Sequence, residues 1–269
     1  MGYAIHHNEI KKIPFYNRLY IKLKFYYIDD FIRRIKIFFF NILINSNKKI
    51  ETQFNNSIIN INLEKIDHNL FNKQKFIYVE NILNKDFHQL ICDNWPQKFF
   101  FTSPTSYYKN YNTGFRVRTK ISGNYNPYIN KEIYPQNIKW IKLFYDFLQT
   151  SDFEKRIEKI FQKKYRLEYA LLTHADQGSS VAAHKDQVRK HEATINTLQF
   201  MFFIKGAEVP NSGELCLIKN NDWSELLCRP KNLNNSLLIF DKKANFFHGI
   251  NPIEKNKFRY AIGACFKTI

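Results

Sequence analysis

The chain has 269 residues, of which 44% are hydrophobic and 17% aromatic, and it carries a formal net charge of +17 at pH 7. A chain of this length and composition can bury a full hydrophobic core, which excludes a disordered or fibrous protein and favours one domain with an added helical region. The positive charge favours anionic partners such as a nucleic acid, an anionic sugar or an acidic membrane face. A lysine-rich solvated surface without such a partner explains the charge equally well.

The cysteines and the first residues indicate a reducing compartment. The four cysteines have no CxxC spacing and no accompanying histidine cluster, so they predict buried thiols rather than a zinc site or a disulfide framework; they are Cys92, Cys216, Cys228 and Cys265. Residues 1–13 lack the apolar segment of a secretion signal. We therefore expect a cytoplasmic location, with association at the inner face of the membrane as one form of it.

Residues 14–44 predict a basic amphipathic helix. Apolar residues recur there at intervals of three and four, among them Phe15, Leu19, Leu23, Tyr27, Phe31, Ile35, Phe38 and Ile42. Basic residues are interleaved with them, namely Arg18, Lys22, Lys24, Arg33, Arg34 and Lys36. The longest apolar run in this segment, Ile37 to Phe40, is far shorter than the roughly 20 residues of a membrane span. The helix therefore either packs its stripe on the domain or lies at a membrane surface, and we expect it to govern location rather than chemistry.

The Asn-rich residues 45–62 have no clean period and predict a linker. We accordingly divide the chain into an N-terminal basic helical region with its linker, residues 1–71, and a second domain, residues 72–269. The second domain is expected to hold the chemistry.

The second domain starts with a predicted strand, Phe76–Val79, and a predicted helix that Asn84 opens. That helix must end before Trp95, because the residue preceding a proline is pushed out of the α region. Residues 107–128 are rich in Tyr and Asn and predict a loop that covers a substrate. Residues 138–161 return to helical spacing and predict helices that buttress the following strands.

Short apolar runs separated by turn residues fill the rest of the chain. They predict strands at Glu168–Thr173, Val181–His184, Thr194–Ile204, Glu214–Ile218, Ser236–Phe240, Phe247–Ile250 and Arg259–Phe266. Residues 210–213 and 232–235 have the composition of turns. The fold class is therefore α+β but mainly β, a jelly-roll barrel with its core in residues 167–269.

His184, Asp186 and His248 have the spacing of a two-histidine, one-carboxylate iron site. Residues i and i+2 at the end of a strand point to one face, so the side chains of His184 and Asp186 can occupy adjacent coordination positions. A distant antiparallel strand would deliver His248. Such a site fills three of the six positions around Fe(II) and leaves the others open for a co-substrate and dioxygen.

Several motifs in this order resemble the 2-oxoglutarate- and Fe(II)-dependent dioxygenases, in particular the prolyl-hydroxylase-like and phytanoyl-hydroxylase-like branch. They are Gly178–Val181 before His184-Lys185-Asp186, Ser212–Leu217, Ser236–Phe240, Phe247–Ile250 with Pro252, and Arg259 eleven residues after His248 (259 − 248). The resemblance covers roughly Leu167 to Ile269. It implies a double-stranded β-helix, which is a cupin-like barrel, and it implies Fe(II), 2-oxoglutarate and O2 as cofactor and co-substrates.

The resemblance also assigns Arg259 to the far carboxylate of 2-oxoglutarate, which a guanidinium group binds through two parallel hydrogen bonds. Many relatives have a hydroxyl residue two positions later, where this chain has Ala261. The second contact is therefore expected from Thr173, Tyr169 or Gln199.

A second His-x-Asp motif, His174-Ala175-Asp176, competes with the first. It precedes Gly178-Ser179-Ser180, whereas the family places its motif after that segment and a short apolar strand. We therefore prefer His184 and Asp186 as ligands.

Two classes of function remain open. The first is an oxygenase that hydroxylates or desaturates an unactivated C–H group of a small metabolite or an anionic cell-surface sugar, with release of succinate and CO2. The second is a non-catalytic cupin-like barrel that binds a metal or a sugar. A protein side chain or a nucleobase is also open as the substrate, and nucleic acid is the least favoured partner. Because Asp186 is kept, the resemblance excludes the related halogenases, in which Gly or Ala opens a position for chloride.

Overall fold

The computed structural model describes residues 59–97, 119–120, 139–176, 181–185, 196–208, 212–220 and 222–269, with single residues between 28 and 42. The helices are η3 (Leu63–Lys65), α4 (His68–Gln74), α5 (Lys85–Asp93), α6 (Lys139–Phe147) and α7 (Ser151–Phe161). The strands are β1 (Phe76–Glu80), β2 (Thr119–Lys120), β3 (Tyr165–Asp176), β4 (Val181–His184), β5 (Thr197–Gly206), β6 (Leu215–Ile218), β7 (Leu226–Cys228), β8 (Ser236–Asp241), β9 (Phe247–Ile250) and β10 (Phe258–Thr268).

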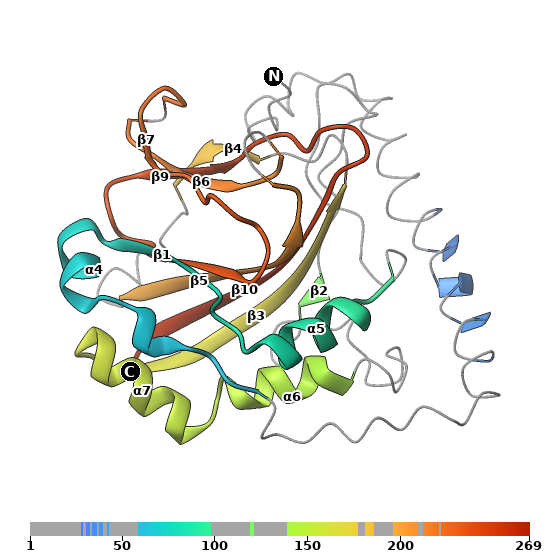
Figure 1. Ribbon diagram of the computed structural model, residues 1–269, viewed down its shortest axis with the longest axis horizontal. Helices are drawn as coiled ribbons and strands as arrows, with labels where there is room; N and C mark the ends of the chain where they lie inside the picture. The colour runs from blue at the N-terminus through green and yellow to red at the C-terminus, as the bar shows by residue number, and fades with distance from the viewer. Residues whose placement is uncertain are drawn as a thin grey trace.

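The described strands form two antiparallel sheets. The larger sheet has the order β1-β8-β5-β10-β3-β2, and the smaller sheet has the order β4-β9-β6-β7. Figure 1 shows the smaller sheet above the larger one. Consecutive strands such as β8 and β9 lie in different sheets, so the chain alternates between the two layers, as a double-stranded β-helix requires.

The larger sheet is apolar on both faces because both faces are covered. On β5, Phe200, Phe202 and Ile204 alternate with Met201 and Phe203, and all five side chains are buried. Such a continuous apolar run is the pattern of a strand buried on both faces. One set of side chains packs beneath the helices, and the other set faces the smaller sheet.

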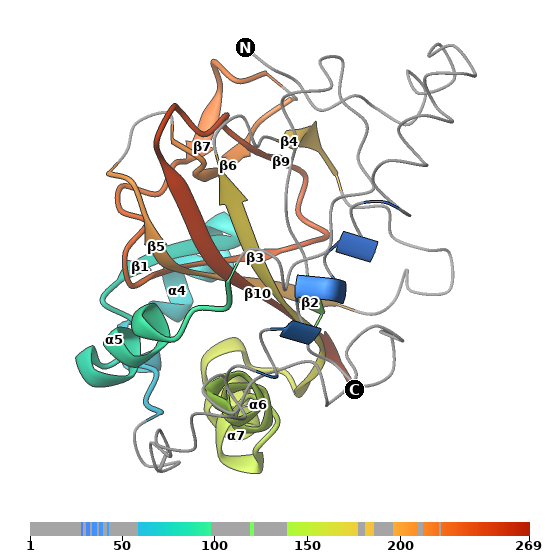
Figure 2. The same ribbon diagram turned by 90° about the vertical axis from the view of Figure 1, so that its right-hand side faces the viewer.

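Helices α5, α6 and α7 cover the outer face of the larger sheet (Figure 2). Thr150 caps α7 by accepting a hydrogen bond from the backbone N–H of Phe153 at 3.3 Å. Along α7, Phe153, Ile157 and Phe161 recur at i, i+4 and i+8, and the first and last contact the aromatic rings of Phe266 and Phe200. These helices confirm the predicted helical segment 138–161.

The core between the two sheets is the interior of the barrel. Met201, Leu238 and Phe240 reach it from the larger sheet, while Leu217 and Ile250 reach it from the smaller sheet. All seven strands predicted between residues 167 and 269 are present, and β4 and β9 have the predicted bounds. Strand β7 was not predicted, because it is short and its Leu226 and Leu227 are exposed rather than core residues.

The packed unit extends further toward the N-terminus than the boundary drawn before residue 72. That boundary falls inside α4, and Ile59, Ile61 and Ile66 are buried in the same core as Phe71 and the helices. Ile61 also pairs with Leu83 in an isolated antiparallel bridge. The end of the predicted linker is therefore part of the domain. The predicted lid, residues 107–128, lies outside the described residues except for β2.

The described residues between 28 and 42 are almost all α-helical, and their side chains are exposed. The large apolar ones, Ile28, Phe31, Ile32, Ile35, Phe38, Phe39 and Ile42, are 40% to 64% exposed. These side chains therefore do not pack their stripe on the domain. Within the described part of the chain, no helix has the length and apolar character to cross a membrane.

Candidate metal and co-substrate site

His184 and His248 lie side by side on adjacent strands. They are direct partners in the pairing of β4 with β9, and their ring centroids are 4.3 Å apart. The ring of His248 also lies 5.3 Å from the ring of Phe240 on β8 of the larger sheet. The His248 side chain therefore points into the space between the sheets, and the two imidazoles are available together to a single metal ion.

A glycine beside His248 lets a loop close over the outer side of this strand pair. A Cβ atom at Gly249 would lie 2.7 Å from the ring of Trp223 and 3.1 Å from the backbone of Ala183. Trp223 and Phe247 pack against Ala183, Cys216 and Ile218 on that side. The His-Gly motif thus has a structural reason, since Gly249 permits the close approach of Trp223 behind the paired histidines.

Asp186, the predicted third ligand, lies outside the described residues, which resume at Asn196 after Lys185. Within the described part of the chain, no cluster of three His, Cys, Asp or Glu side chains forms a metal site. The structure therefore brings together two of the three predicted ligands, and the role of Asp186 stays a prediction.

The competing motif lies on the opposite face of the larger sheet. His174 is the pairing partner of Tyr260, and the two rings are 4.9 Å apart. Tyr260 in turn stacks on Trp95 at 4.8 Å, in the layer beneath the helices. His174 is therefore separated by the sheet from the space that His248 faces.

Arg259 bridges the two sheets and has unused hydrogen-bonding capacity. It lies on β10, is fully buried, and donates through Nη1 to the carbonyl of Gly213, two residues before β6, at 2.7 Å. Its Nε and Nη2 atoms are buried without a hydrogen-bond partner among the described residues. Burial lowers the pKa of Arg259 to about 10, and the charge of Glu214 acts in the opposite direction. Arg259 is thus a protonated, buried cation at neutral pH with two donors that an anion would satisfy.

The three candidates for a second carboxylate contact lie at two levels of the barrel, Thr173 at one and Tyr169 with Gln199 at the other. Thr173 pairs with Ala261, two residues from Arg259, and donates its hydroxyl to the Ala261 carbonyl at 3.1 Å. Tyr169 and Gln199 both pair with Cys265, six residues from Arg259, which corresponds to about 20 Å along the strand. Gln199 donates to the carbonyl of Ala264 at 3.2 Å. The structure therefore leaves only Thr173 close to Arg259.

The prediction of buried thiols holds for Cys216 and Cys265, whereas Cys92 and Cys228 are only partly buried. None of the four is in a disulfide, and burial raises the pKa of Cys228 and of Cys265 to about 12. Burial also raises the pKa of Cys216. All three thiols are therefore protonated at neutral pH and are unsuited to bind a metal as thiolates.

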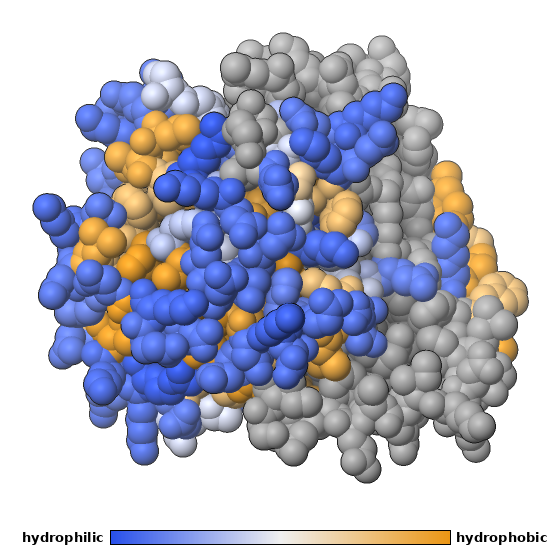
Figure 3. Space-filling model, viewed as in Figure 1, coloured by the Kyte–Doolittle hydropathy of each residue, from blue (hydrophilic) through white to orange (hydrophobic). Residues whose placement is uncertain are grey.

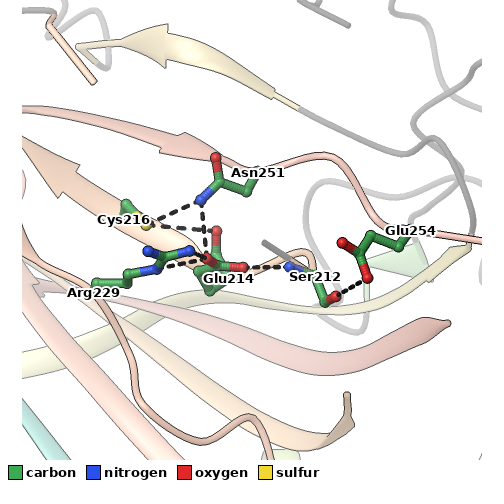
Figure 4. A network of polar contacts seen from close by, with 6 residues as sticks. All are labelled: Ser212, Glu214, Cys216, Arg229, Asn251 and Glu254. Carbon is green, nitrogen blue, oxygen red and sulfur yellow. Dashed lines mark hydrogen bonds and ion pairs between the residues drawn. The ribbon is translucent and has the colours of Figure 1, made fainter. Parts of the chain in front are cut away.

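A buried polar network next to Arg259 was not predicted from the sequence. Its centre is Glu214, which is fully buried and contacts Arg229, Asn251 and Ser212 (Figure 4). Glu214 had been noted only as part of a strand motif, and Arg229 carried no local signal. A charged residue inside a predicted apolar strand is the one feature that could have indicated a buried ion pair.

Comparison with solved structures shows the same barrel. A prolyl hydroxylase from Trichoplax adhaerens, in complex with a hypoxia inducible factor oxygen degradation domain peptide fragment, is 14% identical with a TM-score of 0.54, over 75% of this chain and 86% of that one. HygX from Streptomyces hygroscopicus, with nickel and 2-oxoglutarate bound, is 8% identical with a TM-score of 0.52, over 74% and 84%. A prolyl-4-hydroxylase from Pseudomonas putida is 9% identical with a TM-score of 0.51, over 75% and 97%.

These likenesses define the fold class. The chain has the same double-stranded β-helix fold as these solved structures, which is the fold that the resemblance in the sequence implied. No protein-family model matches the sequence, and no curated protein matches it either. The fold is thus recognised through its three-dimensional arrangement.

Proposed function

We propose that this protein is a 2-oxoglutarate- and Fe(II)-dependent oxygenase. The observation that carries this proposal is Arg259, a fully buried guanidinium group whose Nε and Nη2 atoms have no partner in the described residues. Leaving a buried charge without partners is costly, so the arrangement is stable when an anion occupies that position. The paired rings of His184 and His248 add the imidazole donors that iron accepts.

The residues fit the two groups that the fold family uses. His184, His248 and Asp186 would hold Fe(II), and Arg259 would bind the far carboxylate of 2-oxoglutarate, with Thr173 as the nearest hydroxyl. When bound, iron and 2-oxoglutarate activate O2, and the oxidative decarboxylation to succinate and CO2 drives insertion of an oxygen atom into a C–H bond. The side chains bind, orient and shield; they supply no redox chemistry of their own.

The apolar residues around His248 support the proposal that the protein shields the bound groups from water. Phe240 packs against His248, and Leu217 lies in the same inter-sheet core. Apolar walls exclude water and so strengthen the attraction between Arg259 and a carboxylate. The same exclusion protects a reactive site from side reactions.

The proposal is tested by adding Fe(II) and 2-oxoglutarate without oxygen and recording the weak visible absorption band of their complex. Oxygen is then admitted, and succinate is measured, because turnover without the true substrate can be detected. We expect the band and succinate in the wild type and in Asp176→Ala, and neither in Asp186→Ala.

Two other results would change the assignment. Loss of the band in Asp176→Ala, with the band kept in Asp186→Ala, would move the site to the upstream motif. If all three proteins lack the band, the non-catalytic metal-binding or sugar-binding barrel is the better description.

We further propose that the substrate is an anionic small molecule or glycan that is hydroxylated at an unactivated C–H group. The support is the formal net charge of +17, which raises the local concentration of anions around the protein. Desaturation begins with the same hydrogen abstraction and is the alternative outcome.

The N-terminal helix suggests where the protein works, and we propose that it binds an anionic membrane surface from the cytoplasmic side. We name its seven exposed apolar side chains, Ile28, Phe31, Ile32, Ile35, Phe38, Phe39 and Ile42, the apolar stripe. At 3.6 residues per turn, these positions fall within an arc of about 120° on the helix surface. Figure 3 shows hydrophobic surface at the edge of the molecule where Figure 1 places this helix.

The charges beside the stripe favour a lipid surface over a second protein. Arg34 and Lys36 are exposed and fall on either side of the arc. Residues 14–44 contain six Lys or Arg against two Asp, and the basic ones are Arg18, Lys22, Lys24, Arg33, Arg34 and Lys36. An apolar stripe flanked by basic residues lies in the interface of an anionic bilayer, with the cations at the headgroups.

Sedimentation with vesicles tests this helix. The wild type should sediment with vesicles of phosphatidylglycerol and phosphatidylcholine but not with phosphatidylcholine alone. The double variant Phe31→Ser with Phe38→Ser should bind at least about 100-fold more weakly, since each buried aromatic ring contributes about 1.5–3 kcal/mol. The matched control is Leu226→Ser with Leu227→Ser, which removes two side chains that are 39% and 41% exposed on β7.

Equal vesicle binding by the stripe variant and the control would refute the membrane proposal. Size-exclusion chromatography tests the alternative that a second copy of the chain covers the apolar stripe. In that case the wild type would be a dimer and the stripe variant a monomer.

A further inference from the structure

We infer that Arg229 is a positioning residue that neutralises Glu214 and thereby keeps Arg259 available for the far carboxylate of 2-oxoglutarate. This inference rests on the proposed function and concerns residues that make no contact with the reacting atoms. It explains why a carboxylate is buried so close to a cation that must remain free for a ligand.

Glu214 has close polar contacts with Arg229, Asn251 and Ser212. Its Oε1 accepts hydrogen bonds from Arg229 Nε at 2.8 Å and from Asn251 Nδ2 at 3.0 Å, and Arg229 Nη2 lies 2.7 Å from the same oxygen. Its Oε2 accepts from the backbone N–H of Ser212 at 2.8 Å. Three of these donor atoms therefore lie at Oε1 and one lies at Oε2, so both carboxylate oxygens have a partner. Figure 4 shows the donors converging on this one side chain.

The turn that carries Glu214 also holds Arg259. Gly213 adopts a φ of +87°, and a Cβ atom there would lie 2.5 Å from Ile253 Cγ1, so glycine is required at this position. The Gly213 carbonyl accepts the 2.7 Å hydrogen bond from Arg259 Nη1. Anchoring Glu214 on one side of the turn therefore fixes, on the other side, the acceptor that orients the guanidinium group.

The network joins segments that are distant in the sequence. Ser212 precedes β6, Arg229 follows β7 and Asn251 follows β9, while Arg259 is the second residue of β10. Asn251 also donates its backbone N–H to the Glu214 carbonyl at 3.2 Å. The network therefore connects the ends of β6, β7, β9 and β10 next to Arg259.

The charges of Glu214 and Arg229 also act on Arg259. Glu214 is completely buried, and its negative charge favours the protonated state of Arg259 against the cost of burial. Arg229, whose side chain is 31% exposed, offsets that negative charge from the solvent side. Without the positive charge of Arg229, Glu214 would act as an internal counter-ion for Arg259 and would compete with a bound carboxylate.

The test is the dissociation constant of 2-oxoglutarate, measured anaerobically with Fe(II) present in Arg229→Gln, which keeps a hydrogen-bond donor but removes the charge. We expect about tenfold weaker binding with Fe(II) affinity close to wild type, together with a lower thermal unfolding midpoint, because the buried carboxylate of Glu214 loses its cation. Arg229→Lys restores the charge and should bind 2-oxoglutarate within about threefold of wild type.

A double-mutant cycle separates this mechanism from simple loosening of the fold. In a Glu214→Gln background there is no carboxylate to neutralise, so Arg229→Gln should change the 2-oxoglutarate affinity by less than about twofold. Arg166→Gln on β3 is the matched control, because Arg166 is 60% exposed and contacts Glu154 on the outer surface at 3.7 Å.

The outcomes are distinguishable. Unchanged 2-oxoglutarate affinity in Arg229→Gln, or the same loss in both backgrounds, would overturn the role of Arg229 while leaving the oxygenase proposal intact. A wild-type protein that binds Fe(II) but no 2-oxoglutarate would instead overturn the proposed function and, with it, this inference.

Discussion

Replacing Arg259 with alanine is expected to weaken 2-oxoglutarate binding by about 100-fold or more while leaving Fe(II) bound. The reason is that Arg259 is fully buried and presents two donors, Nε and Nη2, that have no partner in the described structure. Removing the charged partner of a carboxylate in such a site costs a few kcal/mol, and each 1.4 kcal/mol is a factor of ten in affinity. Anaerobic titration of 2-oxoglutarate, followed by the visible band of its iron complex, measures the change.

Arg259→Lys provides the control for geometry. Lysine keeps the positive charge but lacks the planar fork, so we expect an affinity between those of the wild type and Arg259→Ala. Identical titration curves for the wild type and Arg259→Ala would remove Arg259 from the site, whatever the iron content of the two proteins.

Replacing His248 with alanine is expected to lower the affinity for Fe(II) by at least about 100-fold. Residues that only support metal ligands typically contribute 10- to 100-fold in affinity, so loss of a direct imidazole donor should cost at least that much. Equilibrium dialysis with Fe(II), and with Ni(II) as an air-stable substitute, measures the effect without any turnover. His184→Ala should behave in the same way, because the two rings are paired across β4 and β9.

His174→Ala is the matched control for the histidine pair. His174 belongs to the second His-x-Asp motif, but its ring packs on Tyr260 beneath the helices. Its replacement should leave metal affinity within about threefold of wild type, since it removes no donor from the pair. Metal loss in His174→Ala together with retention in His248→Ala would reverse the assignment of the two motifs.

Local pattern was sufficient for most of the barrel. Strands β4 and β9 were predicted with the bounds that they have, because short apolar runs end there at turn residues and a His-Gly pair. The jelly-roll class followed from the number of such runs. The choice of His184 over His174 followed from the order of motifs, and the structure places His184 beside His248.

The pairing of strands in the larger sheet decided which candidate lies near Arg259, a question that the sequence pattern left open. Thr173, Tyr169 and Gln199 were equal candidates in the sequence, and only the register of β3 and β5 against β10 separates Thr173 from the other two. The period of a strand tells which face a side chain occupies, but it contains no information about the level of its neighbour on another strand. That information arises when the sheet assembles.

The N-terminal side of the domain also could not be predicted from the local sequence pattern. Residues 59–62 were predicted as the end of the polar linker, and residues 63–71 were placed outside the second domain, yet Ile61, Leu63 and Phe71 are buried against the helices and the larger sheet. Isolated apolar residues in an Asn-rich stretch have no period of their own, so their burial depends on a surface supplied by distant elements.

Glu214 and Arg229 show why a buried ion pair could not be predicted from the sequence. The two residues are 15 positions apart, and neither position suggests an ion pair by local spacing. Their contact exists because β6 and β7 pair and leave the two side chains facing each other, with Asn251 beside them from the end of β9. Helix and strand signals come from neighbours along the chain, whereas the stabilisation of a buried charge depends on groups that only folding brings within hydrogen-bonding distance.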